Sequence, residues 1–89
     1  ATRISQLENR IGILDRRIAQ TNEEVRGLEA QLEGRKRQSA LIAREVTDLR
    51  RGVERGVIGR NRLLEMEREA ASLSGDEGRI LADIARARQ

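Results

Sequence analysis

Apolar residues recur along the first part of the chain at alternating spacings of three and four. The repeat starts at Ile4, reaches Val53 and covers seven heptads. A period of 3.5 residues is typical of helices that pack side by side with a left-handed supercoil. The sequence therefore predicts a long helix over residues 3–55, about 80 Å in length at 1.5 Å per residue. The apolar repeat positions are Ile4, Leu7, Ile11, Leu14, Ile18, Val25, Leu28, Leu32, Ile42, Val46, Leu49 and Val53.

The repeat breaks where Gly52, Gly56 and Gly59 fall within eight residues. Gly56 suits the position just past a helix end, where a left-handed residue is common. Gly59 can act as the N-cap of a following helix. The two residues between them, Val57 and Ile58, predict a short extended link. We therefore expect a turn over residues 56–59.

A second apolar series with the same spacing follows the turn and predicts a helix over residues 60–89. Its members are Leu63, Met66, Ala70, Leu73, Glu77, Ile80, Ile84 and Ala87, of which only Glu77 is charged. Two helices joined by a tight turn form an αα-hairpin. The expected fold is all-α: a single antiparallel two-helix coiled-coil hairpin over residues 1–89, with a long first helix and a shorter second one.

The unequal helices leave part of the first apolar face without a partner. Folded back from the turn, the second helix should reach about residue 26. Each large side chain left beyond that point represents roughly 1.5–3 kcal/mol of burial. A second copy of the chain, or a continuation of the second helix in a longer parent, should cover them. This predicted self-association seam comprises Ile4, Leu7, Ile11, Leu14 and Ile18.

Some local features complicate the pattern. Thr21 and Glu24 form a capping-box pair, so a helix restart near residue 21 is an alternative to one continuous helix. Ser39 and Arg35 are polar members of the repeat; polar core residues can fix the register of paired helices. For Arg35 we favour a stem lying along the seam with its charge in water. Acidic residues between Gly75 and Gly78 predict a flexible spot.

Composition narrows the possible functions. The chain has no aromatic residue, Cys, His or Pro. Structural zinc sites of the usual kind and Ser-His or Cys-His catalytic groups are therefore excluded. No apolar run is long enough for a membrane span. We predict no catalytic residues, no metal site and no cofactor. The first residue is Ala1 instead of Met, which indicates a segment of a longer protein.

Positive charge gathers at the turn. Residues 50–62 contain five Arg and one Glu, in a chain with a formal net charge of +3. Arginine stays charged and donates several hydrogen bonds, so the turn is a candidate docking surface; a solvated hairpin end is the alternative. Binding of phosphates by these arginines is a further alternative. Against it, no aromatic residue can stack on bases, and elsewhere Arg alternates with Glu.

The turn and second helix carry a resemblance to a known family. Residues 53–64 read VERGVIGRNRLL, residues 64–75 read LEMEREAASLSG, and residues 80–87 read ILADIARA. In this order they resemble the hairpins of membrane fusion proteins, the periplasmic adaptors of the HlyD family, in the type I secretion branch. The resemblance is strongest over residues 49–89. Over residues 1–48 it is weaker and consists only of a heptad-rich helix like the first helix of these hairpins.

The resemblance implies a periplasmic segment of an inner-membrane-anchored protein in a Gram-negative bacterium. Such adaptors sit beside an ABC transporter, which this segment would meet only through parts absent here. Their hairpins assemble, as a hexamer, and the tips meet a TolC-type outer-membrane duct. As a fragment, the chain should form a dimer or larger homo-oligomer, and no nucleic-acid partner is expected. The implied docking tip comprises Arg51, Gly52, Arg55, Gly56, Val57, Gly59, Arg60 and Asn61.

One departure concerns the tip signature of many adaptors, which combines Arg, Leu and Ser or Thr. Aligned through Gly56, its positions hold Asp48, Gly52 and Gly59, and none matches. The family's docking contacts cannot be transferred, and Arg51, Arg55 and Arg60 are the candidates to replace them. The alternative function is a homodimeric coiled-coil tether without a duct; a nucleic-acid-binding helix pair is less favoured.

Overall fold

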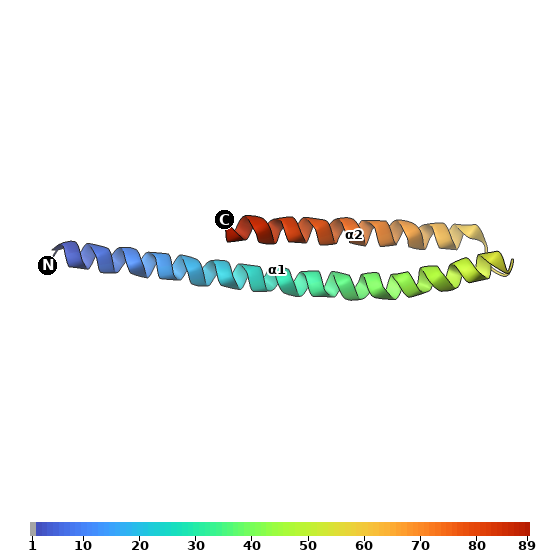
Figure 1. Cartoon of the computed structure of the whole chain (residues 1–89), viewed down its shortest axis with the longest axis horizontal. Coiled ribbons are helices and arrows are strands. Elements are labelled where there is room, and N and C mark those ends of the chain that lie inside the picture. Colours follow the sequence, from blue (N-terminus) through green and yellow to red (C-terminus); the bar gives the residue numbers. More distant parts are fainter. Residues whose placement is uncertain (1) are drawn as a thin grey trace.

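The structure, a computed structural model, describes residues 2–89 and consists of two antiparallel helices (Figure 1). Helix α1 spans Thr2–Glu54 and helix α2 spans Arg60–Arg88. The hairpin measures 82 × 15 × 11 Å, so it is nowhere wider than one pair of helices. The expected all-α hairpin with unequal helices is confirmed. The helix ends lie one residue away from the predicted ones at Thr2, Glu54 and Arg88.

α1 continues without a break past Thr21, so the alternative of a helix restart at this position is wrong. The heptad keeps its phase through this region, and the chain contains no Pro that would remove a backbone donor. The capping-box pair therefore lies inside a helix, where the backbone amides already have partners from the preceding turn.

Two apolar clusters hold the helices together. Both are built from the repeat positions that the sequence singled out, and their central side chains are only 6–8% exposed. The cluster near the turn consists of Ile42, Val46, Met66 and Leu73, flanked by Leu49, Leu63 and Ala70. The cluster farther from the turn consists of Val25, Leu32, Ile80 and Ile84, flanked by Leu28 and Ala87. Since the chain lacks aromatic residues, these aliphatic side chains carry the burial that stabilises the hairpin.

Polar side chains separate the two clusters. The Ser39 hydroxyl donates a hydrogen bond to Glu77 Oε1 over 2.7 Å, in a partly buried position. Beside it, Arg35 Nε lies 3.8 Å from Asp76 Oδ2. We call these four residues the polar layer. A serine and a glutamate that each interrupt their own apolar series thus face one another across the hairpin.

The flexible spot predicted at Asp76 and Glu77 is wrong, since both residues belong to the polar layer. Both residues lie inside the continuous helix α2, and both carboxylates bind side chains of α1. For Arg35, the charge is partly in water, as expected, since its side chain is 46% exposed. Its contact with Asp76 is an ion pair that the sequence pattern did not indicate.

The second helix reaches farther back than predicted. Ala87 packs against the cluster of Val25 and Leu28. Arg88 and Gln89 share a shallow hollow with side chains of α1 as far back as Leu14. The end of α2 thus lies beside Thr21 instead of residue 26. Figure 1 shows the remaining part of α1 extending alone past the C-terminus; we call residues 2–20 the overhang.

Candidate docking tip

Backbone hydrogen bonds fix the shape of the turn. The amide of Val57 donates to the Gly52 carbonyl over 3.0 Å, and the amide of Gly56 donates to the Val53 carbonyl over 3.0 Å. This pair of bonds is the Schellman motif that ends many helices. Gly56 has φ 73°, the left-handed conformation that glycine adopts without a steric cost. Gly59, with extended backbone, is the N-cap of α2. The predicted roles of both glycines are confirmed.

The segment between these glycines folds back toward α1, and the predicted extended link over Val57 and Ile58 is wrong. The Ile58 amide also points to the Gly52 carbonyl, at 3.3 Å. Its side chain occupies the space beside Gly52: a Cβ built on that glycine would lie 2.8 Å from Ile58 Cγ1 and closer still to Cδ1. Only a residue without a side chain allows Ile58 to pack there.

The residues of the predicted docking tip differ in accessibility. Gly52 is buried under Ile58, so it shapes the tip without presenting a surface. The other members are exposed, and Val57 is the most exposed large apolar side chain, at 76%. Ile58 was absent from the predicted tip, although 38% of it is exposed. The only signal for Ile58 in the sequence was Gly52, a glycine about one helical turn before Gly56.

Exposed arginines lie on both sides of the turn in sequence. Arg51, Arg55 and Arg60 are all exposed and flank the turn on both sides. Arg62, on the first turn of α2, forms an exposed ion pair with Glu65 at 3.4 Å. The tip thus offers two exposed apolar side chains, Val57 and Ile58, with exposed arginines on the chain before and after them. Such a surface suits a partner with an apolar contact point surrounded by carboxylates or carbonyls.

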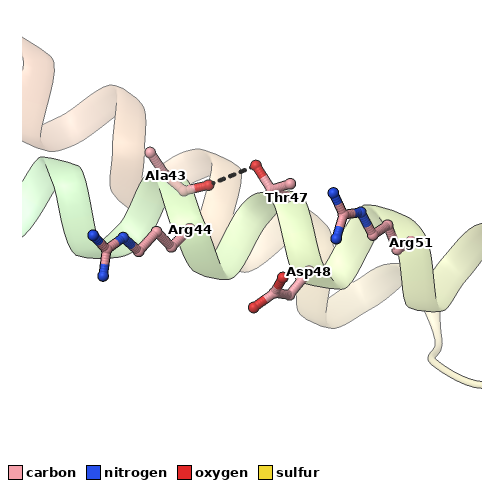
Figure 2. A pocket seen from close by; sticks show the side chains of 5 residues that line it. All are labelled: Ala43, Arg44, Thr47, Asp48 and Arg51. Atoms are coloured by element: carbon pink, nitrogen blue, oxygen red, sulfur yellow. Dashed lines mark hydrogen bonds between the residues drawn. The ribbon is translucent and has the colours of Figure 1, made fainter.

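A shallow hollow lies on α1 just before the tip (Figure 2). It is lined by Ala43, Arg44, Thr47, Asp48 and Arg51, all from a single helix. The Thr47 hydroxyl donates to the Ala43 carbonyl over 3.0 Å, so it is occupied within its own helix. Asp48, the position aligned with the adaptor-signature Arg, lies between Arg44 and Arg51 in Figure 2. One helix alone encloses no cleft, and the hollow extends the charged outer face of the tip.

The predicted self-association seam lies on the overhang. Its five side chains, Ile4, Leu7, Ile11, Leu14 and Ile18, are 54–62% exposed. They continue the repeat positions that α2 covers farther along α1. The structure therefore brings together the tip residues at one end of the molecule and the seam residues at the other.

Residues 2–89 lack two features that other functions require. In that range no group of three His, Cys, Asp or Glu side chains is arranged to hold a metal ion. Neither described helix carries an apolar stretch long enough to cross a membrane.

Comparison with known proteins decides the family. The family described as "AprE, long alpha-helical hairpin" matches residues 1–89, the whole chain. This chain belongs to the AprE family of long α-helical hairpins. This chain is also 38% identical, over 88 residues, to the type I secretion system membrane fusion protein PrsE of Rhizobium meliloti (strain 1021). The resemblance to membrane fusion proteins of type I secretion is thereby confirmed.

The match to PrsE covers nearly all of this chain but only a small part of PrsE. It covers 99% of this chain and 20% of PrsE, so the chain spans about a fifth of the length of that relative. No solved structure matches the chain. The family is defined by a helical hairpin and the relative is a membrane fusion protein, so neither comparison points to catalysis.

Proposed function

We propose that this chain is the hairpin of a periplasmic adaptor in a type I secretion system. In this role its tip docks at a TolC-type outer-membrane duct. Other parts of the parent protein contact an inner-membrane ABC transporter. The observation that carries the proposal is the similarity of the whole chain to PrsE, combined with the geometry of a rigid pair of helices.

Length and tip chemistry support this role. A hairpin of 82 Å spans distance at small cost in residues, because each helical residue adds 1.5 Å. The exposed arginines and Val57 are concentrated at the end where such a bridge must dock. Assembly of several adaptors side by side would place several copies of this tip against one duct. Weak contacts at each tip would then combine into firm docking.

The test is site-directed cross-linking in cells that carry the full-length parent. Single cysteines replace Val57 and Arg60, which is straightforward because the segment has no Cys. A matched variant places the cysteine at exposed Ala30, midway along α1. We expect the two tip variants to capture an outer-membrane duct protein and the Ala30 variant not to do so. Capture of the parent alone at all three positions would contradict duct docking.

A charge test addresses the arginines. Reversal of Arg51, Arg55 and Arg60 to Glu should weaken duct binding by more than tenfold, since opposite charges steer and orient such contacts. Replacement of the same three residues by Lys keeps the positive charge but removes the planar, bidentate hydrogen-bonding group of Arg. This variant therefore shows how much of duct binding depends on charge alone. Unchanged duct affinity after triple charge reversal would show that these residues do not replace the adaptor signature.

A homodimeric coiled-coil tether is the second candidate, and the exposed seam of the overhang favours it. The two candidates predict different partners for the tip. A tether requires only that the seam associates, and its tip has no specific partner. An adaptor hairpin requires in addition that the tip binds a duct.

A further inference from the structure

Each helix carries an uncharged stripe outside the two apolar clusters, in the part of the hairpin where α1 and α2 are paired. The α1 stripe consists of Gly34 and Leu41, and the α2 stripe consists of Ala71, Gly75, Gly78 and Leu81. Neighbouring members lie three, four or seven residues apart, so each stripe follows one face of its helix. Leu41 is 59% exposed and Leu81 is 53% exposed. An uncharged stripe on a helix surface is typical of a face that packs against a partner.

The hairpin itself does not require the glycines of these stripes. A Cβ built on Gly34, Gly75 or Gly78 would meet nothing within 4 Å. Within residues 2–89, only Gly56 has the positive φ that favours glycine. Glycine inside a helix lowers its stability relative to alanine, so these three residues weaken the helices without a gain inside the hairpin. The missing side chains do allow another chain to approach each helix closely.

The two stripes are complementary at matching heights along the hairpin. The hydrogen bond of the polar layer joins residues that lie directly opposite one another. Counting from this pair along the antiparallel helices places Leu41 level with Gly75, and Leu81 within one residue of the level of Gly34. The leucine of each stripe is therefore level with a glycine of the other stripe. Two hairpins that point the same way can fit leucine to glycine at both levels.

Charged residues closer to the tip are complementary as well. The outer face of α1 presents Arg44, Asp48 and Arg51, which line the shallow hollow in Figure 2. At the same height, α2 presents Glu67 and Arg68, which line a hollow of their own next to the α2 stripe. None of these five side chains takes part in an ion pair within residues 2–89. Glu67 can therefore meet an arginine of a neighbouring α1, and Arg68 can meet its aspartate.

Both patterns favour contact between unlike faces. If two parallel copies met through α1 alone, Leu41 would face Leu41 and Arg44 would face Arg44. If they met through α2 alone, Glu67 would face Glu67. Like charges in contact are unfavourable, whereas unlike faces bring leucine to glycine and arginine to carboxylate. Copies that point in opposite directions lose the match of heights.

We propose that the α1 stripe of one copy packs against the α2 stripe of the next copy, with both tips at the same end. Leu41 then fills the space beside Gly75 and Gly78, and Leu81 fills the space beside Gly34. Such a heterologous contact leaves one face of each copy open to a further copy, so it repeats around a ring. This inference rests on the proposed function, in which several copies stand side by side, and names the two faces that meet.

The first experiment identifies the contacting faces in cells that express two differently tagged copies of the full-length parent, without other cysteines. One copy carries Leu41→Cys and the other carries Gly78→Cys, and a short bifunctional maleimide joins them. The control replaces Gly78→Cys by Ser72→Cys. Both positions are exposed and lie three residues from Gly75, the residue level with Leu41, but Ser72 lies outside the stripe. We expect a product that joins positions 41 and 78, and none that joins 41 and 72.

Two results of this experiment would overturn the proposal. One is a product that joins position 41 of one copy to position 41 of the other, which would show contact between like faces. The other is a yield for positions 41 and 78 no higher than that for the control. Capture of a duct by the tip cysteines is scored separately, so failure of duct docking and failure of this contact are distinguishable.

The second experiment exchanges large and small residues. Gly78→Leu fills the space that Leu41 needs, while nothing within its own chain lies within 4 Å of the new Cβ. The reporter is cross-linking between copies that carry Gly34→Cys and Ala82→Cys, two positions at equal height. Gly78→Leu should lower its yield at least tenfold, because overpacking separates the helices. Adding Leu41→Ala should restore the yield, and Ser72→Leu should leave it unchanged. An unchanged yield with Gly78→Leu would contradict the proposal.

Discussion

The overhang and the paired part of α1 share one heptad pattern but differ in burial. Ile18 at an a position is 59% exposed, and the next a residue, Val25, is 7% exposed. Both are β-branched aliphatic residues on the same face of the same helix. The difference arises because α2 ends beside Thr21. A regular apolar repeat therefore shows which face can be buried, and within residues 2–89 it is buried only where α2 packs against it.

The largest expected effect tests this comparison directly. Ile80→Ala, in the cluster that faces Val25 and Leu32, should cost about 2–4 kcal/mol of unfolding free energy, because it leaves a cavity in an aliphatic core. Ile11→Ala in the overhang should leave the unfolding of the dilute, monomeric chain nearly unchanged. Urea unfolding followed by circular dichroism measures both variants. Similar losses for the two substitutions would mean that the overhang is packed in the monomer.

The next effect concerns the tip. Gly52→Ala should lower stability by about 1–2 kcal/mol, because the new methyl group and Ile58 would overlap and one must move. Gly27→Ala lies in the same helix with nothing within 4 Å of the new Cβ. It should instead raise stability by about 0.5–1 kcal/mol through helix propensity. Thermal unfolding of the two variants would show the opposite signs; equal stabilisation would show that Ile58 does not pack on Gly52.

The polar layer offers an intermediate test within the paired part. Ser39→Ala removes the hydrogen bond to Glu77 and should cost about 1 kcal/mol. Ser39→Leu combined with Glu77→Leu should recover or exceed the original stability, since a well-packed apolar pair often matches a polar one. The double variant should also lose uniqueness of register, seen as cross-linking of cysteine pairs one heptad out of step. A double variant that keeps a single register would show that the polar layer does not specify alignment.

The smallest expected effect concerns an exposed ion pair. Arg26 and Glu23 lie 2.9 Å apart, with both side chains more than 70% exposed. Arg26→Ala should change the unfolding free energy by less than about 0.5 kcal/mol, because solvent screens such pairs. The change should shrink further in high salt. A loss above 1 kcal/mol would indicate a role for Arg26 beyond this pair.

Much of the fold could be predicted because its signals are local. The 3.5-residue period identified both helices and placed Val46 and Ile80 in the core. Gly56 marked the turn, since a left-handed residue ends a helix most easily at glycine. The exposed arginines of the tip followed from their position around that turn. Each of these inferences depends on residues that lie within a few helical turns of one another.

The site was predicted less completely because some of its contacts join distant residues. The sequence by itself determined that two helices form, that they pair along one apolar face, and that the first is longer. Only the tertiary structure decided that Ile58 fills the space beside Gly52, that Ser39 meets Glu77, and that α2 ends beside Thr21. The physical reason is the alignment of the two helices. A heptad pattern specifies which face is buried, while the geometry of the turn fixes which residues on that face oppose one another.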